Sequence, residues 1–280
     1  MTIIDFHTHT FPSRIAPTAI RKLQEACRSQ AFTDGTASAL YNSMQKAGIG
    51  RSVVLPVATN PEKVRSMNDV SIQKTGKDGL IYFGCIHPDT PYWHEELNRI
   101  AEAGLKGIKI HPVYQNTDID DIRYLRILDL AGKLGLIVVM HSGYDLAFPG
   151  VIRCSPSMTL KVLRLVGPIK LVMAHMGGWR CWGEEAEALT EAGVYIDTAF
   201  SLGTFTPLDG EQFSEEELKL LSAESFCSLV HTFGSERVLF GTDSPWYDQK
   251  QSLEDFLALP LSETEKRNIL GENGRRLLDL

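Results

Sequence analysis

The sequence predicts an α/β protein with one closed barrel of eight parallel strands and eight helices. Short apolar runs alternate with longer stretches of helical spacing, and the runs contain few alternating polar residues. Such runs are typical of strands that are buried on both faces. A chain of 280 residues suits one (β/α)8 barrel, the TIM-barrel fold, which needs about 250 residues. Because no low-complexity linker divides the sequence, we expect a single domain over residues 1–280.

Each expected strand is short and rich in Val, Ile, Leu or Phe. The eight strands are expected at residues 2–6, 52–58, 80–86, 107–110, 136–140, 169–174, 194–200 and 237–241. Helices are expected between them, at residues 37–47, 61–74, 93–103, 124–133, 157–165, 184–192 and 215–229. A doubly wound open sheet is the competing fold, but it usually has a glycine fingerprint after its first strand, where this chain has His-Thr-His.

Two segments go beyond a minimal barrel. An extra N-terminal helix is expected at residues 17–30, and a long loop after strand seven is expected at 201–214. Both follow strand ends, so a role as a lid or in substrate binding and a plain surface insertion both stay open. Residues 262–280 are expected to close the fold as a helical segment, with Leu277 and Leu278 packed against the barrel.

The composition of the chain indicates which kinds of molecule it is expected to bind. The net charge of −7 argues against nucleic acid, since phosphate binding favours a basic surface. The sequence has no apolar run of transmembrane length and no secretory signal pattern. Its five cysteines are widely spaced without a Cys-x-x-Cys pair, which favours a reducing compartment. We therefore expect a cytoplasmic protein with a small-molecule substrate and without a membrane partner, and we leave assembly into a homo-oligomer open.

The histidines gather at one end of the predicted barrel. Six of the eight stand at or just past the C-terminal end of an expected strand: His7, His9, His87, His111, His141 and His175. That end of a barrel is where its enzymes carry their chemistry. A single histidine at a strand end is more often structural than a metal ligand. Six of them on one face favour a metal site.

The pair His7 and His9 gives the sharpest geometric argument. Residues i and i+2 of a strand point to the same face, so both imidazoles should point into the barrel mouth. Neutral imidazoles placed side by side suit Zn²⁺ or a similar divalent ion. Asp243 directly follows another apolar strand, where burying a carboxylate is costly unless it is paired or bound to metal. A turn or helix-capping role is the alternative for Asp243.

Lys109 and His111 also lie two residues apart on one strand, so they share a face. For Lys109 we rank binding of a substrate carboxylate first, pairing with a buried acid such as Asp197 second, and carboxylation to bridge two metals third. Arg153 and Trp179 lie in loops after later strands. We expect Lys109, His111, Arg153 and Trp179 to bind substrate, although a surface arginine and a loop-packing aromatic residue are common.

Several motifs together are similar to those of a known enzyme family. They are Asp-Phe-His-Thr-His at 5–9, Gly-Ile-Lys-Ile-His-Pro at 107–112, Val-Met-His-Ser-Gly at 139–143, Met-Ala-His-Met-Gly-Gly at 173–178 and Phe-Gly-Thr-Asp-Ser-Pro-Trp at 240–246. In this order they resemble the amidohydrolase superfamily of TIM-barrel metal-dependent hydrolases. The nearest branch is the amidohydrolase-related group that includes aminocarboxymuconate-semialdehyde decarboxylase.

The resemblance implies a metal held by His7, His9, His141 and Asp243. It implies that His175 orients or deprotonates a metal-bound water, or polarises the substrate. Members with two ions bridge them with a carboxylated lysine, and Lys109 lies on the strand where that lysine is expected. We expect one divalent ion rather than two, Zn²⁺ first and Mn²⁺ or Fe²⁺ as alternatives.

The first functional interpretation is a metal-dependent hydrolase. A metal-activated water would attack a small, carboxylate-bearing amide, lactone or ester-like substrate. Asp243 would act as general base and then as acid, and His175 would donate to the developing oxyanion. The alternative is a non-oxidative, metal-dependent decarboxylase, a lyase that would use the same ligands. A barrel without catalysis is a third reading, and the complete ligand set argues against it.

Overall fold

The computed structural model describes all 280 residues, which form two compact units. The first unit comprises Met1–Val54, Asp145–Pro149 and Asp197–Leu280. The second comprises Leu55–Tyr144 and Gly150–Ile196. Each unit buries its own set of apolar side chains, and the pairings between neighbouring strands within each unit are parallel.

The first unit is built around a few short strands and most of the C-terminal helices. Its strands are β1 (Ile4–Thr8), β2 (Arg51–Val54) and β9 (Val238–Leu239). Its α-helices are α1 (Ala16–Cys27), α2 (Ala37–Ala47), α8 (Glu215–Leu218), α9 (Ala223–Phe233), α10 (Gln249–Leu257), α11 (Glu263–Arg267) and α12 (Asn273–Leu278). A 3-10 turn at Ser235–Arg237 precedes β9, and a π-helical turn at Asn268–Glu272 joins α11 to α12.

Strand β1 organises the first unit. It pairs in parallel with β2 and is also bonded to the segment that follows β9. The Phe6 N–H donates to the Phe240 carbonyl at 2.7 Å, and the Asp243 N–H donates to the His7 carbonyl at 2.8 Å. The backbone therefore fixes the residues after β9 next to the end of β1.

The second unit contains the longest run of paired strands. Its strands are β3 (Leu80–Tyr82), β4 (Gly84–Cys85), β5 (Gly107–Ile110), β6 (Ile137–Met140), β7 (Lys170–Met173) and β8 (Tyr195–Asp197), whose last residue belongs to the first unit. Its helices are α3 (Val64–Lys74), α4 (Trp93–Glu102), α5 (Ile122–Lys133), α6 (Pro156–Leu163) and α7 (Glu184–Glu187). The remaining 3-10 turns are Pro61–Lys63 and Thr190–Ala192.

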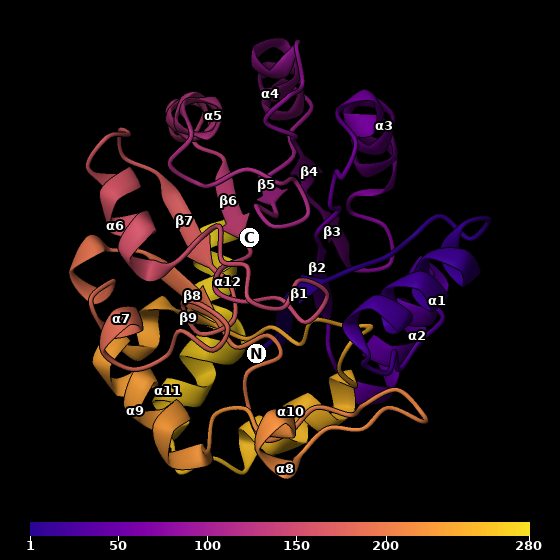
Figure 1. Ribbon diagram of the computed structural model, residues 1–280, viewed down its shortest axis with the longest axis vertical. Coiled ribbons are helices and arrows are strands. Elements are labelled where there is room, and N and C mark those ends of the chain that lie inside the picture. The colour runs from indigo at the N-terminus through magenta and orange to yellow at the C-terminus, as the bar shows by residue number, and fades with distance from the viewer. The chain divides into compact units, whose positions relative to one another are not determined.

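The strands of the second unit run β4-β5-β6-β7-β8, each parallel to its neighbour. Helices α3, α4, α5 and α6 lie along the outer side of this row (Figure 1). All residues of β5 and β6 are buried, as expected for strands that are covered on both faces. The parallel strands all end on one edge, and their ends carry the predicted site residues of this unit.

The segments that the sequence adds to a minimal barrel are present. The predicted extra helix is α1, and the predicted long loop after strand seven is irregular apart from isolated bridges. One of these bridges joins Ser29, just after α1, to Pro207 in the loop. The predicted closing segment forms α11 and α12, with Leu277 and Leu278 buried and Gly274 against Ile4 of β1.

The prediction of one strand over residues 80–86 was wrong in detail, because the structure divides it into β3 and β4 at Phe83. Nine strands therefore stand where eight were expected. All five cysteines are free thiols. None of the helices has the length and apolar character that crossing a membrane requires.

Candidate metal centre

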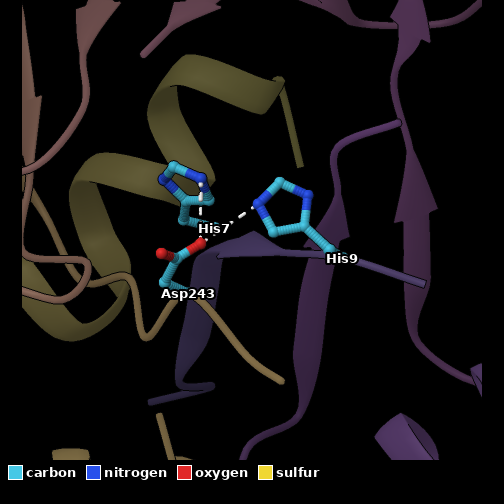
Figure 2. A group of neighbouring side chains, drawn as sticks. All are labelled: His7, His9 and Asp243. Atoms are coloured by element: carbon cyan, nitrogen blue, oxygen red, sulfur yellow. Dashed lines mark hydrogen bonds and ion pairs between the residues drawn. The ribbon is translucent and has the colours of Figure 1, made fainter. Parts of the chain in front are cut away.

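Three side chains of the first unit converge at the end of β1. His7 lies on β1, His9 follows it, and Asp243 lies in the segment after β9 (Figure 2). Asp243 Oδ1 is 3.1 Å from His9 Nε2 and 3.5 Å from His7 Nε2. One possible ligand atom from each residue lies within 4.8 Å of the others. The sequence predicted all three as ligands, and the structure brings their side chains together.

A second carboxylate sets the protonation of His7. Asp197, the last residue of β8, accepts a hydrogen bond from His7 Nδ1 at 2.8 Å, and both side chains are buried. Because an ionised carboxylate only accepts, the proton of His7 lies on Nδ1. The lone pair of Nε2 is then left on the side that faces Asp243 and His9. This is the arrangement in which a carboxylate orients a metal-binding histidine.

The donor set of this cluster fits a divalent transition metal. Two imidazole nitrogens and one carboxylate oxygen are ligands that Zn²⁺ and Mn²⁺ accept. The residues present therefore fit the metal that the sequence predicts.

Two of the predicted catalytic residues have left-handed backbone. Asp243 has φ of 65° and His175 has φ of 62°, values that non-glycine residues seldom adopt. Each costs of order 1 kcal/mol or more, and such residues cluster at functional sites. In Asp243 this conformation is compatible with the bond from its N–H to the His7 carbonyl. The strained backbone at Asp243 and His175 favours a functional role for both residues.

The second unit brings three histidines together at the ends of β5, β6 and β7. The rings of His111 and His141 are stacked, with centroids 4.0 Å apart and an interplanar angle of 11°. His141 Nδ1 is 3.0 Å from His175 Nε2, and His141 Nε2 is 3.1 Å from the Tyr144 carbonyl. Since a carbonyl only accepts, His141 carries a proton on Nε2, and its Nδ1 shares a hydrogen bond with His175 Nε2. In this structure both ring nitrogens of His141 are engaged inside its own unit.

The predicted substrate-binding residues have different environments. Lys109 is almost wholly buried in β5, and Trp179 is buried beside Gly143, with which it forms a parallel bridge. Arg153 is partly exposed, and its guanidinium bonds Asp118 at 2.8 Å. Lys109 therefore has the burial of a site residue, whereas Arg153 is held at the surface by an acid.

Burial shifts the pKa of two groups near the strand ends. Burial raises the pKa of the Asp5 carboxyl to about 6, and hydrogen bonds from Thr242, Gln249 and His7 oppose the rise. Burial also lowers the pKa of His87, which the nearby Asp89 opposes. A lowered pKa keeps His87 neutral at pH 7, so this ring is suited to lining a pocket and not to carrying charge.

Asp197 is the residue that sequence reasoning missed. It follows the apolar residues of strand β8 directly, which is the same signal that selected Asp243. We expected it only as an alternative partner of Lys109. In the structure β8 ends at Asp197, whereas the expected strand ran on to residue 200 and placed Asp197 in its interior, so the strand-end criterion did not select it.

Comparison with known proteins supports this reading of the fold. The family model described as Amidohydrolase matches residues 4–280. A search of curated protein sequences finds no match. A solved TIM-barrel protein from Bordetella bronchiseptica is 18% identical with a TM-score of 0.74, and the match covers 100% of this chain and 99% of that one.

Two similar structures carry the names of enzymes. One is a dihydroxybenzoic acid decarboxylase from Polaromonas, solved with manganese and the inhibitor 2-nitroresorcinol. It is 14% identical with a TM-score of 0.68, and the match covers 100% of this chain and 97% of that chain. The other is a putative 2-pyrone-4,6-dicarboxylic acid hydrolase from Pseudomonas putida, which is 19% identical with a TM-score of 0.64. That match covers 99% of this chain and 97% of the hydrolase chain. These likenesses show the fold, and the predicted TIM-barrel class is confirmed. Because the family model spans almost the whole sequence, the chain belongs to the amidohydrolase family.

Proposed function

We propose that this protein is a metal-dependent lyase that removes carbon dioxide from a small carboxylic acid without an oxidant. The observation that carries the proposal is the convergence of His7, His9 and Asp243 on one point at the end of β1. The named decarboxylase with bound manganese among the similar structures favours this reaction over hydrolysis. The proposal thus reverses the order of preference that the sequence suggested.

The metal would be a divalent ion held by His7, His9 and Asp243, with His141 proposed as a further ligand. Zn²⁺, Mn²⁺ and Fe²⁺ all suit this donor set, and manganese in the similar decarboxylase favours Mn²⁺ as the first ion to test. A bound ion supplies Lewis-acid stabilisation of negative charge on a substrate oxygen. Engaging His141 in this way requires that one of its two present hydrogen bonds be given up.

The reaction needs one bond broken and one proton delivered. The bond between the carboxylate carbon and its neighbour breaks, the electron pair stays on the neighbouring carbon, and carbon dioxide leaves. A proton then takes its place on that carbon. We propose His175 and Asp243 as the residues that hold and transfer this proton, because both stand at strand ends in strained backbone.

Substrate recognition is proposed for the buried residues of β5 and their surroundings. The Lys109 ammonium, if it faces the substrate, would pair with a carboxylate in a medium where the charge is poorly screened. His111 and Trp179 would supply aromatic walls. Arg153 is proposed only as a peripheral contact, since Asp118 already binds it.

Hydrolysis is the second candidate, favoured by the putative pyrone dicarboxylic acid hydrolase among the similar structures. There Asp243 would take a proton from water and pass it to the leaving group. Both reactions use the same ligands, so the products must distinguish them.

The deciding experiment incubates the Mn²⁺-loaded or Zn²⁺-loaded protein with a panel of aromatic and unsaturated carboxylic acids in D₂O. We expect carbon dioxide in amounts equal to substrate lost, with one deuterium on the carbon that held it. His7→Ala should lose the reaction, and His231→Ala, at an exposed histidine of α9, should keep it. Ring-opened or amide-cleaved products that retain every carboxyl group would establish hydrolysis instead.

A further inference from the structure

The Asp5 carboxylate lies at the centre of a network of buried hydrogen bonds in the first unit. It is wholly buried in β1, two residues before His7. Oδ1 accepts from the backbone N–H of His7 at 3.1 Å and from that of Thr242 at 3.0 Å. Oδ2 accepts from the Thr242 hydroxyl at 2.6 Å and from Gln249 Nε2 at 2.7 Å. One carboxylate therefore accepts four hydrogen bonds.

These bonds join the two segments that carry the candidate metal ligands. His7 is itself a donor to Asp5, and Thr242 is the residue before Asp243. The Thr242 hydroxyl also accepts from the Ser244 N–H at 3.1 Å, so it fixes the backbone on the far side of Asp243. The spacing between His7 and Asp243 is thus held through Asp5 as well as through their own backbone bond.

The partner set matches a carboxylate. Two of the four partners are backbone N–H groups, which only donate, and an ionised carboxylate offers only acceptors. An asparagine that kept its oxygen on these two donors would turn its NH₂ group towards the Thr242 hydroxyl and the Gln249 amide. Both of these groups would then have to reorient, because Asp5 has no exposed surface at which water could take their place.

We propose that Asp5, held by Thr242, is a positioning residue that sets the distance between His7 and Asp243 for metal binding. The inference rests on the proposed metal-dependent function. Metal sites require ligand distances within about 0.2 Å, so a shift of either segment lowers affinity even when the fold survives. Asp5 acts through the ligands and does not bind the ion itself.

The test measures the dissociation constants of Mn²⁺ and Zn²⁺ by competition with a chromophoric chelator, together with the Tm of the metal-free protein. Asp5→Asn and Thr242→Val should each raise the dissociation constants about tenfold or more. Thr242→Ser keeps the hydroxyl and should stay within about threefold of the wild type. The matched control is Thr159→Val, which removes a hydroxyl bond to the Ser155 carbonyl from an equally buried threonine of α6, on an element that carries none of the proposed ligands.

Thr159→Val should lower the Tm of the metal-free protein about as much as Thr242→Val but leave metal affinity unchanged. The inference is overturned if Thr242→Val binds metal as the wild type does, or if Thr159→Val weakens binding equally. If Asp5→Asn does not fold, the metal dissociation constants of Thr242→Val and Thr242→Ser still test the inference. A wild-type protein that takes up neither ion would instead refute the proposed function.

Discussion

At the scale of single residues, the proton on His7 Nδ1 depends on Asp197. Asp197→Asn should weaken metal binding about tenfold to a hundredfold, the range found when a carboxylate behind a ligand histidine is lost. The physical reason is that a neutral amide holds the ring less firmly and leaves Nε2 less basic. The same chelator competition measures the effect. Asp209→Asn, an exposed carboxylate of the same unit, serves as control, and equal affinities for both variants would contradict the role of Asp197.

The residues that sequence could predict are those whose spacing fixes their direction. His7 and His9 share a face because strands have a period of two, and the structure does bring them together with Asp243. Asp5 and Asp197 could not be assigned in this way. Their importance depends on partners 237 and 190 residues away along the chain, and no local pattern specifies those contacts. The roles of His141 and His175 in catalysis stay predictions.

At the scale of elements, the backbone at Gly143, just after β6, packs so closely against the segment after β7 that it leaves no room for a side chain at this position. Gly143 has φ of 82°, and a Cβ there would fall 2.2 Å from the Trp179 carbonyl oxygen. We expect Gly143→Ala to lower the free energy of unfolding by about 3 kcal/mol or more, since both the backbone angle and the close approach are violated. Denaturant unfolding measures the loss.

Gly150→Ala separates the two causes. Gly150 has a similar φ of 78°, but nothing lies within 4 Å of its added Cβ. This control should lose only about 1 kcal/mol, the cost of the backbone angle alone. Equal losses at both glycines would mean that the contact between the segments after β6 and β7 contributes nothing.

Helix α5 gives a prediction of pH dependence. Its N-cap Asp121 bonds the side chain and the N–H of Arg123, which together lower the pKa of the carboxyl to about 2. Because this folded-state pKa lies below the unfolded value of 3.8, the ionised group stabilises the fold above about pH 4, and this contribution disappears as the pH falls towards 2.

Asp121→Asn keeps a good helix cap but removes the charge. The variant should be less stable than the wild type at pH 7, by about 1 kcal/mol or less because solvent screens this partly exposed pair. The difference should vanish near pH 2. Urea unfolding at several pH values measures it, and a difference that persists in acid would exclude the ion pair as its cause.

At the scale of the whole molecule, the alternation of apolar runs and helical stretches was sufficient to predict the TIM-barrel class, which the comparisons confirm. Element bounds were less predictable, as the division of residues 80–86 between β3 and β4 shows. Periodicity reports which faces are buried and not where backbone hydrogen bonds change partner. The type of reaction could not be predicted from the sequence, because hydrolysis and decarboxylation would use the same metal-binding residues.

Metal removal tests the fold and the site together. A ligand that binds only the folded state stabilises it by about 2.7 kcal/mol at a concentration of 100 times its dissociation constant. For a chain of this size we expect the Tm to rise about 5 °C when Mn²⁺ or Zn²⁺ is returned to the metal-free protein at that concentration. His7→Ala should abolish the rise, whereas His94→Ala, at an exposed histidine of α4, should retain it. Differential scanning calorimetry measures both, and a rise that survives in His7→Ala would place the metal elsewhere in the chain.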